Sequence, residues 1–126
     1  MKTISLFATV FALIVSPALA DENHDIISKV MKDGLKGKTS PLARVLDGEA
    51  DAEETKSLAE LVRTMGGTQA PVGDQAGYDD KVAELIAALD AVAGGDTGPD
   101  AIHRLDNASS CKACHSDHKP KKKKKA

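Results

Sequence analysis

The chain of 126 residues is poor in aromatic side chains and in cysteine. Its aromatic residues are Phe7, Phe11 and Tyr78, and its only cysteines are Cys111 and Cys114. Two cysteines exclude a disulfide-rich scaffold. A chain of this length forms one small domain at most, which excludes a large enzyme with a deep cleft of its own. No apolar run reaches the ~18 residues of a membrane span, so we expect no integral membrane segment.

The formal net charge of the whole chain is only −2, but its two parts differ in sign. Residues 21–118 hold 19 acidic against 10 basic side chains, and residues 119–126 hold six lysines. The acidic body lacks the interleaved aromatic and basic residues of a nucleic-acid-binding module. We therefore expect no nucleic-acid partner.

The N-terminal segment has the pattern of an export signal. One positive charge precedes a nearly unbroken apolar stretch over residues 4–15, and residues 16–20 end in an Ala-x-Ala pattern. The pattern predicts a signal peptide over residues 1–20, cleaved after Ala20, and hence a periplasmic protein. The alternative is a buried N-terminal helix. Export places both cysteines in an oxidising compartment.

The apolar residues of the mature chain recur with the period of a helix, and no segment alternates with period two. The pattern predicts four amphipathic helices: 22–36, 51–65, 78–93, and a fourth from Pro99 to the cysteines. A short helical turn is expected over residues 42–46. Short connections between the helices predict an all-α fold, an antiparallel up-down four-helix bundle formed by residues 21–118.

Local signals mark the helix boundaries. Ser40 followed by Pro41 is typical of a helix start, and Asp51 with Glu54 has the spacing of a capping box. The glycine-rich residues 66–77 are expected to form a loop.

The core of this bundle is short of large side chains. The mature chain has twenty large aliphatic residues, Met65 among them, and one aromatic residue, Tyr78. For ~100 residues that is a thin core. We expect a planar apolar cofactor to complete it, and the chain without that cofactor to be largely unfolded.

Residues 111–115, C-K-A-C-H, form the one motif of the sequence with a recognisable chemical role. C-x-x-C-H is the attachment signature of haem c. Cysteines three apart on a helix lie on one face, so Cys111 and Cys114 can bond the two vinyl-derived carbons of one porphyrin. His115 follows closely enough to bind the iron as an axial ligand. The motif predicts one covalently attached haem c.

Three other uses of these residues remain open. A disulfide or thioredoxin-like dithiol requires the pair at a helix N-terminus beside a strand, whereas the expected position is the end of a helix. A structural zinc site could use Cys111, Cys114, His115 and His118, although four ligands so close in sequence are cramped. Inert buried cysteines are the third alternative.

A C-x-x-C-H motif at the end of a four-helix chain resembles class II cytochromes c, the cytochrome c′ type. Class I proteins carry the motif near the N-terminus with a methionine ligand after it, and no methionine follows His115. The resemblance covers the architecture of residues 22–119. It rests further on the Met31-Lys32 pair and on Lys119.

The resemblance implies a role for Met31. In that family the first helix supplies the residue over the open face of the haem, and Met31 stands at this position. It is therefore expected as the sixth iron ligand, with Gly34 leaving room for the porphyrin edge. The alternative is that Met31 is a core residue beside a vacant or water-bound iron, as in cytochromes c′ proper.

Two positions depart from the family. Ile27 stands where an arginine is common, which removes a contact to a haem propionate. His118 stands in place of an aromatic residue shortly after the haem histidine. These departures concern details of the haem pocket rather than haem attachment.

The other histidines are assigned lesser roles. His24 shares a helix face with Met31 and is either solvated or an alternative ligand. His103 is expected on the same helix as His115, about 120° around it, at the surface. His118 is expected to tune the site from the His115 side of the haem.

The motif and the resemblance predict a monohaem cytochrome that exchanges single electrons with redox partner proteins by ferric–ferrous cycling. No catalytic constellation stands out, so we expect no enzyme. The alternative function is that of a gas-binding protein that takes NO or CO at a vacant sixth site.

The lysine-rich end forms a segment of its own. Consecutive like charges repel and Pro120 discourages helix continuation, so residues 119–126 are predicted to be a disordered tail. The five lysines Lys121–Lys125 either keep the chain soluble or dock it to an acidic partner or to anionic lipid.

Overall fold

The computed structural model describes residues 18–120. Every regular element in that part of the chain is a helix, so the all-α prediction is confirmed there. Most of the predicted signal peptide and the lysines Lys121–Lys125 lie outside the described residues. The elements in chain order are α1 (Ala18–Val30), the π-helix η1 (Met31–Leu35), α2 (Pro41–Leu46), α3 (Ala52–Arg63), α4 (Gln75–Ala93), α5 (Pro99–Ala108) and α6 (Cys111–His118).

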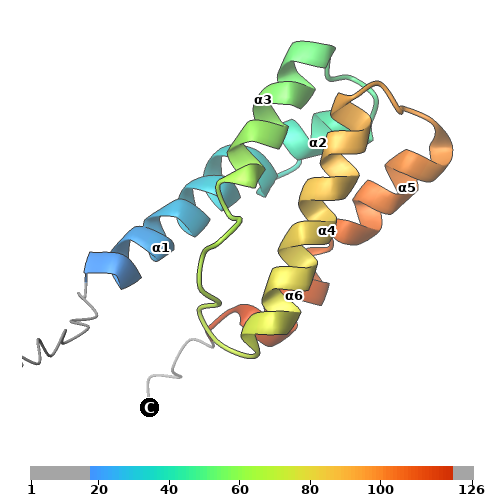
Figure 1. Cartoon of the computed structure of the whole chain (residues 1–126). Helices are drawn as coiled ribbons and strands as arrows, with labels where there is room; N and C mark the ends of the chain where they lie inside the picture. The colour runs from blue at the N-terminus through green and yellow to red at the C-terminus, as the bar shows by residue number, and fades with distance from the viewer. Residues whose placement is uncertain (1–17, 121–126) are drawn as a thin grey trace, which may run out of the picture.

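Helix α4 is the central element of the fold. It packs against α3 on one side and α5 on the other, and α6 packs against it as well. Helix α2 lies against α3 and α5, whereas η1 contacts α1, α2 and α3. Figure 1 shows α1 extending away from the packed helices, with the start of α4 and α6 at the same end of the molecule.

The helix starts predicted at Ser40 and Asp51 are confirmed, whereas α4 begins at Gln75, within the loop predicted for residues 66–77. Ser40 caps α2, and its hydroxyl accepts a hydrogen bond from the Ala43 amide at 3.2 Å. Asp51 and Glu54 form the complete capping box of α3, with both reciprocal hydrogen bonds present at 2.8 and 3.0 Å. Each pair satisfies backbone donors that the first turn of a helix leaves without an intrahelical partner.

The fourth predicted helix is wrong in one respect, because it is two helices. Helix α5 ends at Ala108, and Ser110 caps the new helix α6, accepting from the Ala113 amide at 3.4 Å. Serine side chains compete with helical hydrogen bonding and favour caps, which gives a physical reason for the break. His103 and His115 therefore lie on different helices.

The first predicted helix changes its winding at Met31. Residues 31–35 are π-helical, and the Met31 carbonyl accepts from the Lys36 amide at 2.8 Å. Within this turn Gly34 is buried against α3. A Cβ atom placed on Gly34 would lie 3.0 Å from Leu61 Cδ2 and 3.1 Å from Leu58 Cδ1. The absent side chain thus admits the leucines of α3, and the expected space for a porphyrin edge at Gly34 is not there.

The buried core lies between α2, α3, α4 and α5. Met65 is 3% exposed, which confirms it as a core residue, and Tyr78, the single Phe, Tyr or Trp of residues 18–120, is buried. Helix α1 contributes only Val30 to the buried apolar residues among its described side chains, and α6 contributes none. Helices α1 and α6, at the two ends of the described chain, therefore add little to the buried apolar core.

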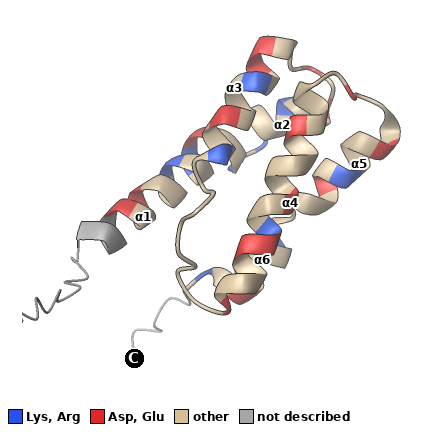
Figure 2. Cartoon of the chain, in the orientation of Figure 1, with Lys and Arg blue, Asp and Glu red and all other residues tan. Residues whose placement is uncertain are grey.

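Charged residues are spread along the helices rather than gathered on one of them (Figure 2). Ion pairs join neighbouring elements: Arg44 with Glu54, Arg63 with Asp90, Lys81 with Asp117, and Arg104 with Glu84. Such exposed pairs add little stability individually. Within residues 18–120, no helix has the length and apolar character needed to cross a bilayer.

Candidate cofactor-attachment site

The first turn of α6 presents both thiols. Cys111 is exposed, Cys114 is half-buried, and neither is joined in a disulfide. The Cys111 sulfur lies 4.0 Å from the carbonyl of Ser109. Residues three apart are neighbours on a helix surface, so one planar group can contact both sulfurs.

Burial raises the pKa of the Cys114 thiol. The ammonium of Lys81 opposes this effect, while the charges of Asp117 and Cys111 add to it. At neutral pH Cys114 is therefore a protonated, partly desolvated thiol.

His115 follows Cys114 on the same turn of α6 and is half-buried. Its imidazole forms no hydrogen bond with another residue of the described chain, in contrast to His118 on the next turn. An imidazole without a protein partner keeps a nitrogen lone pair for an iron ion. The donor set of this turn, two thiols and one imidazole, has the chemistry of haem c attachment.

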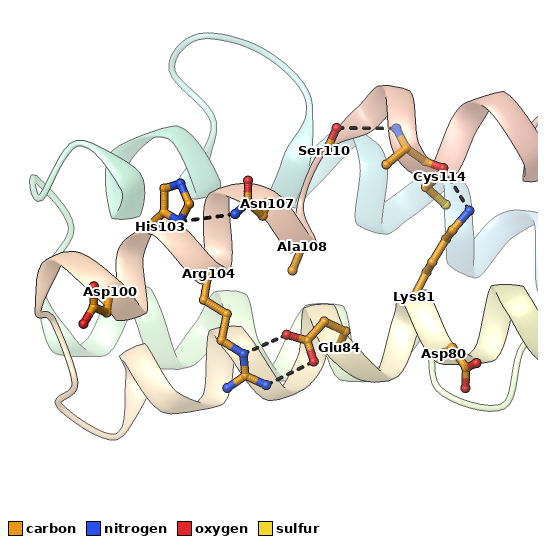
Figure 3. A pocket seen from close by; sticks show the side chains of 11 residues that line it. Asp80, Lys81, Glu84, Asp100, His103, Arg104, Asn107, Ala108, Ser110 and Cys114 are labelled. Atoms are coloured by element: carbon orange, nitrogen blue, oxygen red, sulfur yellow. Dashed lines mark hydrogen bonds and ion pairs between the residues drawn. The ribbon is translucent and has the colours of Figure 1, made fainter.

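Lys81 of α4 holds α6 in place. Its ammonium donates to the Ala113 carbonyl at 2.9 Å and to the Asp117 carboxylate at 2.9 Å. Figure 3 shows the Lys81 side chain reaching α6 beside Cys114. No sequence signal marked Lys81, because the contact joins residues that are far apart in the chain.

A groove of about 670 Å³ lies between α4, α5 and α6, with Cys114 among its lining residues. The Arg104 guanidinium donates two hydrogen bonds to Glu84 across it, at 2.7 and 3.0 Å. His103 lines the same groove, 3.2 Å from the Asn107 amide (Figure 3). His103 is exposed, as predicted, although on a different helix from His115.

Met31 lies on η1, half-buried against the core. Because η1 packs on α1, α2 and α3 while α6 packs on α4, the chain alone does not bring Met31 against His115. His24 is exposed, and its ring lies 3.9 Å from the Asp25 carboxylate.

The zinc alternative finds no support in the geometry. The His118 ring is engaged elsewhere, since its Nδ1 lies 3.1 Å from the Val72 carbonyl oxygen and its ring meets Tyr78 edge to face. No three His, Cys, Asp or Glu side chains within residues 18–120 are grouped closely enough to hold a metal ion.

The dithiol alternative needs a correction, because the cysteine pair does lie at a helix N-terminus, that of α6. The expectation that the pair lies at the end of a helix is therefore wrong. One observation still opposes a thioredoxin-like dithiol: no strand lies beside the pair in the described part of the chain.

The chain was compared with protein-family models, with curated proteins and with solved structures, and none of these comparisons gives a match.

Proposed function

We propose that the protein is a periplasmic c-type cytochrome that carries single electrons through one covalently attached haem c. The observation that carries the proposal is the first turn of α6. Cys111 and Cys114 are free thiols one turn apart, and the half-buried His115 beside them has no hydrogen-bond partner in the described chain. Thioether bonds from both sulfurs would hold the porphyrin, and His115 would bind its iron.

The distribution of buried side chains supports this proposal. Helices α3, α4 and α5 share an apolar core, whereas α6 adds no buried apolar side chain and α1 adds only Val30. Ile27 and Met31 are only half-buried. A haem bound by α6 would give these side chains an apolar partner. We propose that α1, α3, α4 and the α5–α6 pair form the up-down four-helix bundle in the haem-loaded protein.

Met31 is the proposed sixth ligand. Its thioether is a soft donor that favours ferrous iron and raises the reduction potential, which suits an electron carrier. Its place at the start of a π-helical turn is a second indication, because such turns are frequent at functional sites. For Met31 to reach the haem, α1 and η1 must move toward α6 when haem is attached.

Bound haem would supply a one-electron couple between ferric and ferrous iron. The chain would hold it through Cys111 and Cys114, set its orientation through α6, and limit access of other ligands through Met31. A vacant sixth position would instead give the gas-binding alternative, in which NO or CO binds the ferrous protein.

An optical experiment separates the two functions. Spectra of the ferric and ferrous protein are recorded with and without carbon monoxide, for the wild type, Met31→Leu and the matched control Met65→Leu. An electron carrier gives low-spin wild-type and Met65→Leu spectra that carbon monoxide leaves unchanged, and a high-spin Met31→Leu protein that binds it. A high-spin wild type that binds carbon monoxide readily would overturn Met31 ligation and favour the gas-binding function.

A further inference from the structure

His118 is the one histidine of the described chain that is buried, with 5% of its surface exposed. It is the last residue of α6, one turn beyond His115. Its Nδ1 atom lies 3.1 Å from the carbonyl oxygen of Val72, in the loop between α3 and α4. Because a carbonyl can only accept, Nδ1 is the donor and carries a proton.

The His118 ring also packs against the ring of Tyr78. The two rings meet edge to face, with centroids 5.5 Å apart and planes at 74°. Tyr78 is 2% exposed, and its hydroxyl is paired with Thr68 at 2.8 Å. His118 therefore docks the end of α6 onto a fixed partner at the start of α4 and onto the loop that precedes it.

Gly73 makes room for this contact. At Gly73, where φ is +85°, a Cβ atom would lie 2.5 Å from the Asp117 carbonyl oxygen and 3.0 Å from His118 Nδ1. The first distance is too short for any side chain, so the loop approaches α6 this closely only with glycine at position 73.

We propose that His118 is a positioning residue for the haem site: it fixes the rotation of α6 and thereby the direction of the His115 imidazole. This inference rests on the proposed haem function. Helix α6 is eight residues long and contributes no apolar side chain to the core, so polar contacts must set its orientation. Residues three apart share a helix face, so a rotation at His118 also turns His115.

Two substitutions separate the contacts of His118. His118→Phe keeps a ring against Tyr78 but removes the hydrogen bond to Val72. His118→Asn keeps a donor at the position of Nδ1 but removes the ring. His103→Phe and His103→Asn are the matched controls, because His103 is an exposed histidine of the neighbouring helix.

The readouts are made on the haem-loaded protein. Proton NMR signals of the haem methyl groups and of the His115 ring, shifted by the ferric iron, report the orientation of the imidazole. Hydrogen exchange of the α6 amides reports how often the helix detaches. We expect His118→Phe to shift the NMR pattern and to speed exchange about fivefold, the equivalent of one net hydrogen bond. His118→Asn, which keeps the hydrogen bond, should retain most of the protection of the α6 amides that His118→Phe loses.

A second pair of variants leaves His118 intact and remains informative if His118→Phe does not fold. Gly73→Ala introduces a Cβ atom against Asp117 and His118. Gly67→Ala has a similar backbone cost, since φ is +82° there, but its Cβ atom would meet nothing within 4 Å. We expect the NMR pattern of Gly73→Ala to shift in the direction of the His118→Phe pattern, and that of Gly67→Ala to match the wild type.

The outcomes distinguish this inference from the function on which it rests. If the wild type attaches no haem, the proposed function fails, and the positioning of His115 toward an iron fails with it. If haem attaches, but His118→Phe and Gly73→Ala give the same NMR pattern and α6 exchange as their controls, the positioning role of His118 is overturned.

Discussion

The hydroxyl groups of Thr68 and Tyr78 form a buried polar pair, 2.8 Å apart. Thr68 donates its own proton to the Met65 carbonyl at 2.6 Å, so the Tyr78 hydroxyl is the donor within the pair. This hydrogen bond orients the buried ring of Tyr78, against which His118 packs. At the scale of single residues, a chain of contacts therefore links His118 of α6 through Tyr78 to Thr68 in the loop after α3.

A double-mutant cycle tests this pair. Thr68→Val preserves shape but leaves the Tyr78 hydroxyl buried without an acceptor, so we expect it to lower the free energy of unfolding by about 1–3 kcal/mol. In the Thr68→Val background, Tyr78→Phe removes the unpaired hydroxyl and should cost much less than in the wild type. Chemical denaturation of the haem-loaded protein gives all four values. Additive costs would show that the two hydroxyls do not interact.

At the scale of the elements, the sequence contained the signals for helix starts but not those for helix winding. The caps at Ser40 and Asp51 are local patterns, and both were predicted. The π-helical turn at Met31 includes Gly34, whose close approach to α3 is a tertiary contact that no local pattern records. The break at Ser109–Ser110 was overlooked, although two consecutive serines were a usable signal.

The candidate site was predictable only in part, for a similar reason. The C-x-x-C-H motif marks Cys111, Cys114 and His115 as candidate haem ligands because their spacing alone is the attachment signature. The contacts that hold α6 could not be inferred, since Lys81 and Val72 meet α6 only through the tertiary fold.

The pairing of α4 with α5 gives a pH-dependent prediction. The hydrogen bond from Arg104, together with its positive charge, holds the pKa of Glu84 below the ordinary value of 4.5. A lowered carboxyl pKa contributes stability above pH 4.5 that is lost as the pH falls through the lower, folded-state value. Arg104→Met should raise the pKa of Glu84 toward its ordinary value.

NMR titration of the Glu84 carboxyl carbon provides the measurement. Arg63→Met, which breaks the exposed α3–α4 ion pair with Asp90, serves as the control and should leave the Glu84 titration unchanged. If Glu84 titrates alike in the wild type and in Arg104→Met, the pair does not persist in solution.

At the scale of the whole molecule, stability is expected to be uneven. The core shared by α3, α4 and α5 is continuous without a cofactor, whereas α1 and α6 depend on few buried contacts. The sequence alone predicts that the haem-free chain is largely unfolded. The structure specifies where the loss should be greatest, at the two ends that would face the haem.

The variant Cys111→Ala/Cys114→Ala, which cannot attach haem, tests this expectation. We expect low helicity overall, with residual hydrogen-exchange protection confined to α3, α4 and α5 and none in α1 and α6. The haem-loaded wild type is the reference. A double variant with wild-type helicity and protected α1 and α6 would show that the fold does not need a cofactor.

The lysine tail is a second feature of the whole molecule. We expect removal of residues 120–126 to slow electron exchange with the anionic reagent ferricyanide at low ionic strength, and to have little effect at high salt. A cationic cobalt complex is the control reagent, with which the truncated protein should react at least as fast as the full chain. Equal ferricyanide rates at low salt would leave the tail only a solubilising role.

The mass of the intact, denatured polypeptide tests the central claim most directly. The full chain is produced in a periplasm that contains a cytochrome c maturation system, and the purified protein is unfolded in acid before mass spectrometry. Because thioether bonds survive denaturation, the account predicts the mass of residues 21–126 plus one haem, and the loss of that addition in Cys111→Ala/Cys114→Ala. A wild-type mass equal to that of the bare polypeptide would contradict haem attachment and, with it, the proposed function.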